Sequence, residues 1–350
     1  MLIALSFDAR GAQTWTPPDL SSYAELPIEV RVGLQVDQIT QVDQRAENFG
    51  IVATLRMEWL DSNLAFTPPQ DRLPFQGFSG AAFIARADAE NLFYPGFTMV
   101  NQQGRRFASE SNIIVFPDGR AVYFERFTVT LQAPDFDFRG YPFDSQRFFV
   151  AFQTQWSNRI MRFVADEPFT GLGDHLGEEE WMFRAVGIEY PSLTNIMGQP
   201  STGITFVFEA DRHIWYYILR IFVPLLIIIT VSWVTFFLQD FSKRVDISAG
   251  NLLVFVAFNF AISGDLPRLG YMTFLDAILA MSFVVTSLAV VWNVLLRRFE
   301  VAGMERGARL VDAYTFWLYP GAYAVVTYLA FRYFFPDWSV GFLLRHLTSQ

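Results

Sequence analysis

The chain of 350 residues contains no cysteine and only three histidines. Disulfide bonds, thiolate nucleophiles and cysteine-ligated metals are therefore excluded, and a histidine-rich metal site has few possible ligands. Charged residues make up 17% of the chain, well below the roughly 25% typical of soluble domains. These shortages argue against an intrinsically disordered protein, a nucleic-acid-binding protein and most metalloenzymes.

Hydrophobic residues are abundant instead, at 52% of the chain, with 17% aromatic residues and 38 phenylalanines. The excess of negative charge is uneven along the chain. Up to Arg212 there are 27 acidic and 16 basic residues, whereas from His213 onward 10 basic residues exceed 8 acidic ones. This composition indicates a membrane protein with an acidic domain at residues 1–212 and a membrane-embedded domain at residues 213–350.

Four apolar stretches in the second domain are each long enough to cross a hydrocarbon core of ~30 Å as helices. They cover residues 214–238, 245–263, 271–296 and 312–335. Basic residues gather in the loops after the first and third stretches, which places those loops in the cytoplasm. The amino-terminal domain and the carboxyl terminus are therefore predicted to lie outside.

Residues 1–212 read as strands, because β-branched and aromatic residues alternate with polar ones in short runs, at 30–36, 52–59, 121–131 and 204–208. The turn Pro117-Asp118-Gly119 predicts a hairpin, and the whole domain one β-sandwich. The apolar run at residues 1–6 is shorter than the core of a secretory signal, although an external amino terminus requires export. We therefore expect either that the numbering starts near a processing site or that a leader has been replaced.

The second apolar stretch is much more polar than the other three. An ionised carboxylate facing lipid would cost about 2.5 to 3.5 kcal/mol, so its polar face is predicted to line a water-filled pore. Asp246 would attract cations there, and rings of Leu253 and Phe260 would gate by dewetting. The alternative is that Asp246 pairs with a basic residue such as Arg244 and marks the helix end. Residues at helical spacing on the predicted pore face are Asp246, Gly250, Leu253, Ala257, Phe260 and Gly264.

Residues 141–146, Tyr-Pro-Phe-Asp-Ser-Gln, match the aromatic-Pro-Phe-Asp-x-Gln loop of the prokaryotic pentameric ligand-gated ion channels, relatives of the Cys-loop neurotransmitter receptors. The chain resembles this family over nearly its whole length. Pro134 and Phe148 stand where animal receptors have paired cysteines, as is usual in bacterial members. Weaker matches follow in the family's order at residues 59–66, with Asn63 in place of Arg, at 93–101, with Phe93 in place of Trp, at Pro224 and 232–233, and at 266–273.

The resemblance implies an all-β extracellular sandwich followed by a four-helix transmembrane bundle, with five identical subunits around a central pore. It implies a ligand-gated channel of the bacterial inner membrane, with the amino-terminal domain and the carboxyl terminus in the periplasm. A small molecule or a proton would be the agonist, monovalent cations the permeant ions and membrane lipid the surroundings. No cofactor and no nucleic-acid partner is expected.

In the family, a basic residue just before the first transmembrane helix pairs with acids of the outer domain and couples it to the pore. Arg212 holds that position, and a simple stabilising ion pair is the alternative explanation for it. The residues that inherit the coupling role by resemblance are Arg212, Asp144, Asp43, Tyr141, Pro142, Phe143 and Pro267.

The agonist pocket of the family lies between neighbouring subunits, where aromatic side chains hold amines by cation–π attraction. Matching positions are Tyr94, Val100, Trp156 and Tyr190 on one subunit and Thr54 and Arg56 on the next.

Protons are the rival agonist. Mutual repulsion in the acidic cluster of Asp174, Glu178, Glu179 and Glu180 could raise pKa values; the same oxygens could bind Ca²⁺, or the segment could be a solvated loop. The three histidines, His175, His213 and His346, are isolated from one another in the sequence, and isolated histidines more often have no special role.

Other functional classes fit the sequence less well. No GxSxG, HExxH, P-loop or dinucleotide-binding motif occurs on a suitable element, so an enzyme is not predicted. Four spans without an internal repeat argue against a secondary transporter. The remaining alternative is a non-conducting membrane receptor with a β-sandwich ectodomain, which would not need a polar face on its second span.

Overall fold

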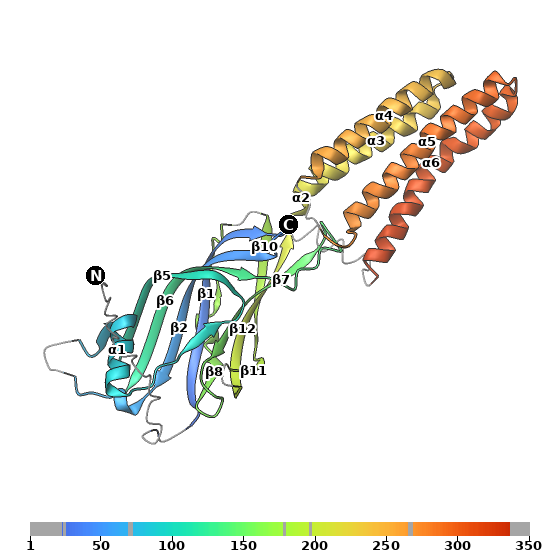
Figure 1. Cartoon of the computed structure of the whole chain (residues 1–350). Coiled ribbons are helices and arrows are strands. Elements are labelled where there is room, and N and C mark those ends of the chain that lie inside the picture. Colours follow the sequence, from blue (N-terminus) through green and yellow to red (C-terminus); the bar gives the residue numbers. More distant parts are fainter. Residues whose placement is uncertain are drawn as a thin grey trace, which may run out of the picture. The chain divides into compact units, whose positions relative to one another are not determined.

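A computed structural model describes residues 23, 26–68, 73–177, 180–195, 198–264 and 269–336. The chain forms two compact units. Unit 1 comprises Met1–Pro134, Arg147–Glu178 and Arg184–Glu209, and unit 2 comprises Asp135–Gln146, Glu179–Phe183 and Ala210–Gln350. Strands fill the first part of the chain and long helices the second (Figure 1). Two loop segments that precede residue 212 thus belong with the helices.

The strands of the described chain form two sheets. The larger has the order β3-β5-β6-β2-β1-β8, with β9 on β1, and the smaller has the order β10-β12-β7-β4, with β11 on β12. The strands are β1 (Ile28–Asp43), β2 (Asn48–Leu60), β3 (Gln76–Ser79), β4 (Phe97–Met99), β5 (Gln102–Val115), β6 (Arg120–Gln132), β7 (Ser145–Thr154), β8 (Met161–Ala165), β9 (Gly171–Leu172), β10 (Trp181–Glu189), β11 (Ser192–Thr194) and β12 (Pro200–Arg212).

The two sheets share one core. Burial alternates along β2, as expected when one face of a strand packs inward and the other faces outward. Phe49 on β2 and Phe148 on β7 are both fully buried, and their ring centroids lie 5.1 Å apart. The predicted β-sandwich is confirmed, and the strands predicted at 30–36, 52–59, 121–131 and 204–208 lie within β1, β2, β6 and β12.

The predicted hairpin is also present. β5 ends at Val115 and β6 begins at Arg120, and the amide of Gly119 donates to the carbonyl of Phe116 at 3.0 Å. Gly119 has φ +88°, and a Cβ there would lie 2.4 Å from the carbonyl oxygen of Asp61. Only glycine combines this backbone conformation with so close a neighbour.

The all-β prediction is wrong at one place, the helix α1 (Gly80–Glu90). Ser79 caps it by accepting a hydrogen bond from the amide of Ala82, and Asn91 ends it in the left-handed conformation. Phe83 and Ala87, one turn apart, are buried. A single buried pair is a weak periodic signal, which is why the sequence pattern did not reveal this helix.

Unit 2 contains the long helices. The first runs without a break through α2 (Ile214–Tyr217), the π-helical turn η4 (Ile218–Phe222), α3 (Val223–Val234) and the 3₁₀ turn η5 (Thr235–Phe237), and it is followed by α4 (Phe241–Ile262), α5 (Phe274–Val301) and α6 (Glu305–Phe334). Three segments of the described chain are long and apolar enough to span a membrane: Ile214–Phe237, Phe241–Ile262 and Phe274–Val301. α6 has 30 residues and is long enough to span a membrane, but its apolar character is too low for it to be counted with these three segments.

Capping residues explain where the helices begin. α4 starts at Phe241 because the side chain of Asp240 accepts hydrogen bonds from the amides of Ser242 and Lys243. α5 starts at Phe274, where Thr273 and Asp276 form a capping box. Asp276, which the sequence places inside an apolar stretch, is therefore part of a helix start.

The helices pack α4 against α5 and α5 against α6, with α3 beside α4 (Figure 1). One cluster joins η5, α5 and α6 through Phe236, Ala289, Tyr319 and Tyr323, and another joins α4, α5 and α6 through Phe241, Leu296 and Ala308. Buried polar groups pair between helices, as between Asn293 and Ser248 at 2.9 Å.

Candidate functional site

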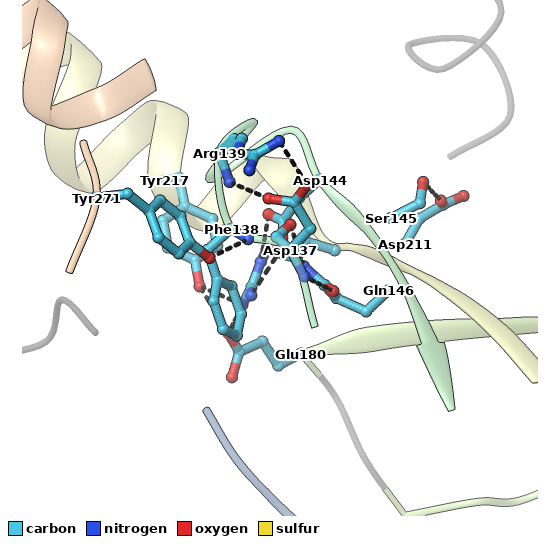
Figure 2. Close-up of polar contacts among 11 residues, drawn as sticks. Asp137, Phe138, Arg139, Asp144, Ser145, Gln146, Glu180, Asp211, Tyr217 and Tyr271 are labelled. Atoms are coloured by element: carbon cyan, nitrogen blue, oxygen red, sulfur yellow. Dashed lines mark hydrogen bonds and ion pairs between the residues drawn. The ribbon is translucent and has the colours of Figure 1, made fainter. Parts of the chain in front are cut away.

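Arg212, the last residue of β12, is the centre of a buried ion-pair cluster in unit 2. Its side chain is fully buried and donates to both oxygens of Asp144, at 2.8 Å from Nε and 3.2 Å from Nη2. Asp144 also accepts a hydrogen bond from Gln146, whose amide nitrogen donates to the carbonyl of Asp137 as well (Figure 2). The pair predicted from the family's loop motif is therefore formed, whereas its role in gating stays a prediction.

Glu180 is a second carboxylate on Arg212. Nη1 of Arg212 lies 2.6 Å from its Oε1, and the hydroxyl of Tyr217 donates to the same oxygen at 2.6 Å (Figure 2). The backbone of Glu180 accepts from the amide of His213 at 2.9 Å. Glu180 thus connects the residue before α2 with α2 itself. The side chain of Glu180 is 37% exposed, against 3% for Asp144, so water reaches one carboxylate and hardly the other.

Aromatic rings enclose the guanidinium. The central carbon of Arg212 lies 4.0 Å from the ring centroid of Trp181 and 4.8 Å from that of Tyr141, within cation–π range. Burial lowers the pKa of Arg212, but the charge and hydrogen bonds of Asp144 outweigh it and raise the pKa above its usual value. Burial raises the pKa of Tyr141 to about 12. The cluster therefore holds a permanent cation beside neutral phenols.

The loop that carries Asp144 is bonded to the start of α5. The amide of Phe274 donates to the carbonyl of Arg139 at 2.8 Å, and that of Leu275 donates to the carbonyl of Tyr141 at 3.2 Å. These are amides of the first turn, which have no acceptor within their own helix. The amide of Phe138 donates to the hydroxyl of Tyr271 at 3.0 Å (Figure 2). Displacement of this loop would therefore pull directly on α5.

Phe143, predicted for the coupling role, sits in an aromatic cluster of unit 2. Its ring centroid lies 5.7 Å from Phe222, 5.9 Å from Phe274 and 6.5 Å from Phe335. The bond between Tyr141 and Pro142 is cis. The loop thus contacts the first and third long helices through one side chain.

Two other residues predicted for coupling are not in this cluster as described. Asp43 belongs to unit 1, where its carboxylate accepts from the amides of Arg45 and Ala46 at 2.9 and 3.0 Å. Its pairing with Arg212 stays a prediction. Pro267 lies outside the described residues.

The acidic cluster is described only in part. Asp174 is exposed, Glu180 is bonded to Arg212, and Glu178 and Glu179 lie outside the described residues. Within the part of the chain that the structure describes, no group of three or more His, Asp or Glu side chains could hold a metal ion. Of the histidines, His175 and His213 are exposed, and His346 lies outside the described residues.

All six residues of the predicted pore face are exposed within one subunit, Leu253 by 70% and Phe260 by 81%. Five of them lie on α4, and Gly264 follows the end of this helix at Ile262. The opposite face is buried through Arg244, Ser248, Asn251, Phe255 and Ile262. Phe260 also borders a hollow of about 550 Å³ between α4 and α5, together with Asn259 and Phe283. Whether the exposed face lines a pore stays a prediction.

The structure corrects part of the argument from polarity. Ser248 and Asn251 face protein rather than water: Ser248 accepts from Asn293 on α5 at 2.9 Å, and Asn251 donates to the carbonyl of Ile228 on α3 at 2.9 Å. Their polarity is explained by hydrogen bonds between helices, which replace water in an apolar environment. Asp246 is the acidic residue that remains on the exposed face of α4.

Two of the predicted agonist residues touch each other in unit 1. Nε1 of Trp156 donates to the carbonyl of Tyr94 at 3.3 Å, and Val100 is 52% exposed nearby in sequence. Tyr94 also borders a cavity of about 180 Å³ with Trp59, Arg106 and Tyr123. Burial, followed by the charge of Asp88, raises the pKa of Tyr94. These groups line the cavity largely with aromatic surface.

The other three agonist candidates are engaged in separate contacts. Arg56 binds Asp166 and Glu58, each at 2.5 Å, and its guanidinium lies within cation–π distance of the rings of Phe124 and Phe169. The hydroxyl of Thr54 donates to Asp37 at 3.0 Å. The hydroxyl of Tyr190 accepts from the amide of Ala165 at 3.0 Å. Arg56 therefore presents a neutralised ion-pair group rather than an isolated positive charge.

Three contributors to the Arg212 cluster were missed from the sequence. Glu180 was read as part of an acidic loop, and Trp181 and Tyr217 were not singled out. Trp181 is the first residue of β10, and Tyr217 is the last residue of α2. The spacing in the sequence could have indicated Tyr217. A helix that starts at Ile214 places Tyr217, five residues after Arg212, back beside the end of the strand.

The chain thus combines a sandwich of two sheets with a following set of helices that are long and apolar enough to span a membrane, and this combination defines a class of membrane receptor. The model of the neurotransmitter-gated ion-channel ligand binding domain matches residues 13–213. The chain belongs to this family, whose members are ligand-gated ion channels and not enzymes.

Relatives of known activity support this assignment. The chain is 27% identical over 277 residues to the proton-gated ion channel of Gloeobacter violaceus, covering 79% of this chain and 74% of that one. It is 26% identical over 282 residues to a gamma-aminobutyric acid receptor beta subunit of Lymnaea stagnalis, and 24% identical over 284 residues to the human rho-2 subunit. These matches cover 75% of this chain but only 54% and 57% of the two receptor subunits.

Proposed function

We propose that five copies of this chain form a cation-selective channel in a bacterial inner membrane, with α4 of each copy lining the pore. The observation that carries the proposal is the division of α4 into two faces. One face packs on α3 and α5 through buried side chains, and the other leaves Asp246, Leu253 and Phe260 exposed. Five symmetric copies would place a carboxylate ring and two apolar rings along one axis.

The location of charge on α4 favours cations over anions. Of the basic residues at its start, Arg244 is buried and bound to Asp312, so its charge is compensated away from the exposed face. Lys243 is exposed and lies 3.9 Å from Asp240. Asp246 is thus opposed on the exposed face by a single, partly compensated lysine of the described chain.

In this proposal α6 is the fourth span, and both termini lie in the periplasm. The basic residues Arg297, Arg298, Arg306 and Arg309 flank the connection between α5 and α6, and the positive-inside rule therefore supports a cytoplasmic position for that connection. α6 packs on α5 along its length, which supports its membership of the same bundle.

A small molecule or a change in proton concentration would open the channel from unit 1. The relatives are named for both kinds of stimulus, protons in Gloeobacter and gamma-aminobutyric acid in the animal subunits. The strand β12 continues from unit 1 directly into Arg212 and then α2, so the Arg212 cluster is the proposed coupling element. A non-conducting receptor is the competing function.

The deciding experiment is electrical. Purified protein is reconstituted in planar bilayers under a NaCl gradient, and pH steps and a panel of amines and carboxylates are applied. A gated current that reverses near the Na⁺ equilibrium potential supports the proposal. Reversal near the Cl⁻ potential overturns cation selectivity. Silence under all stimuli, with pentamers confirmed by native mass spectrometry, favours the non-conducting receptor.

A further inference from the structure

Pro320 interrupts the hydrogen-bond ladder of α6, although the helix continues through it from Glu305 to Phe334. Proline has no amide hydrogen, so the carbonyl four residues earlier, that of Phe316, loses its intrahelical donor. In an apolar environment no water replaces that donor, and an unsatisfied carbonyl is costly. The carbonyl of Phe316 therefore needs a partner from another helix.

Trp233 on α3 supplies this partner. Its Nε1 donates to the carbonyl oxygen of Phe316 at 3.0 Å. The rings of Trp233 and Phe316 pack with their centroids 5.3 Å apart, and the ring of Phe237 contacts Phe316 at 4.9 Å. The indole is thus held against α6 by packing as well as by the hydrogen bond.

The missing amide distinguishes the carbonyl of Phe316 from its neighbours in α6. Each other carbonyl in a helix interior already accepts from the amide four residues later, whereas at Phe316 the indole of Trp233 is the donor that takes the place of that amide. We propose that Trp233 and Pro320 together form a lock that fixes the axial register of α6 against α3, with Trp233 as the positioning residue. Neither residue sets the register without the other.

The register matters because other polar contacts of α6 depend on it. Tyr323, one turn beyond the proline, shares a hydrogen bond with Thr286 at 2.7 Å and donates to the carbonyl of Ser282 at 3.1 Å. The ring of Tyr319 packs on Phe236 of the first long helix at 5.4 Å. A slip of α6 by even one residue, about 1.5 Å along its axis, would misalign all three contacts.

A double-mutant cycle tests the lock in the full-length protein purified in detergent. Trp233→Phe keeps an aromatic ring but removes the donor, and Pro320→Ala gives residue 320 an amide that pairs with the Phe316 carbonyl inside α6. We expect Trp233→Phe alone to lower the apparent unfolding temperature by about 2 to 4 °C. In the Pro320→Ala background the same change should lower it by less than half as much.

Trp292 on α5 provides a matched control. Its Nε1 donates to the side-chain oxygen of Thr315 on α6 at 2.9 Å, an acceptor that does not depend on the proline. Trp292→Phe should therefore lower the unfolding temperature equally with and without Pro320→Ala. If Trp233→Phe also lowers the unfolding temperature equally with and without Pro320→Ala, the lock does not exist.

A second measurement reports the register itself. Since the chain has no cysteine, the pair Phe236→Cys and Tyr319→Cys can be cross-linked by oxidation without background. We expect slower cross-linking when Trp233→Phe is added, and the same slowed rate when Trp233→Phe and Pro320→Ala are combined. An unchanged rate in the Trp233→Phe protein would overturn the role of Trp233 in positioning α6. Both measurements are independent of the ion and the agonist.

Discussion

Arg244 on α4 holds Asp312 on α6 with two hydrogen bonds, of 2.5 and 2.9 Å, while two further N–H groups donate to the carbonyls of Phe236 and Leu238 at the end of the preceding helix. The guanidinium is buried, with only 3% of the side chain exposed. From the sequence alone, an ion pair with Arg244 is the alternative explanation for Asp246. The structure gives it a different partner and leaves Asp246 on the opposite, exposed face.

The Arg244–Asp312 pair should be strongly stabilising only as a pair. Asp312→Asn leaves a buried cation without its carboxylate, and we expect a loss of about 3 to 5 kcal/mol in the free energy of unfolding. The combination Arg244→Met with Asp312→Leu should recover part of that loss, because an apolar pair needs no compensation. Lys243→Gln, at an exposed pair, should cost at most about 1 kcal/mol. Thermal unfolding in detergent measures all three, and equal losses for Asp312→Asn and Lys243→Gln would contradict the argument.

Asp246 should set the preference for cations. Asp246→Asn removes the carboxylate from the exposed face of α4, so the permeability ratio of Na⁺ to Cl⁻ or the single-channel conductance should fall. Asp246→Glu keeps the charge and should stay close to the wild type, whereas Lys243→Gln should raise the ratio. Reversal potentials under a NaCl gradient give the ratio. An unchanged ratio and conductance in Asp246→Asn would remove this residue from ion selection.

The coarse architecture could be predicted from the sequence because it depends on long patterns. Four apolar stretches predicted the long helices, and the alternation of apolar and polar residues predicted the sandwich. The motif at 141–146 predicted the contact between Asp144 and Arg212. Individual partners could not be predicted in the same way. Ser248 and Asn251 are polar whether they face water or another helix, and only the packing of α3 and α5 shows which. In the sequence Glu180 is one of three consecutive glutamates in a loop, and only the structure shows that it lies just before β10 and pairs with Arg212.

The two acids of the Arg212 cluster, Asp144 and Glu180, should contribute unequally to channel gating and to the stability of the folded protein. Asp144→Asn removes a carboxylate that is almost fully buried, whereas Glu180→Gln alters one that is 37% exposed and partly screened by water. We expect Asp144→Asn to reduce agonist-evoked current and unfolding temperature more than Glu180→Gln does. Arg212→Ala should abolish the current while pentamers still assemble, as checked by size-exclusion chromatography and native mass spectrometry. A normal current in Arg212→Ala would refute the coupling role.

Leu253 should act as an apolar gate. It is 70% exposed on α4, and five copies facing one axis would form a hydrophobic constriction that excludes water when narrow. Leu253→Ala widens and weakens that constriction, so opening should need a lower agonist concentration or a smaller pH step. Ile262→Val, on the buried face of the same helix, is the matched control and should leave activation unchanged. Equal activation curves for Leu253→Ala and the wild type would exclude this residue as the gate.

Tyr141 should make stability fall in alkaline solution. Burial raises its pKa from 10.0 to about 12, so the phenol stays neutral in the folded protein at a pH where the unfolded chain already ionises. Its contribution to stability is complete below pH ~10 and is lost as the pH rises toward ~12, because the unfolded state releases its proton first. The unfolding temperature of the wild type should therefore drop more steeply between these values than that of Tyr141→Phe, which has no proton to release. Thermal unfolding at several pH values from 9 to 12 in one detergent compares the two slopes, and parallel slopes would show that Tyr141 ionises equally in both states.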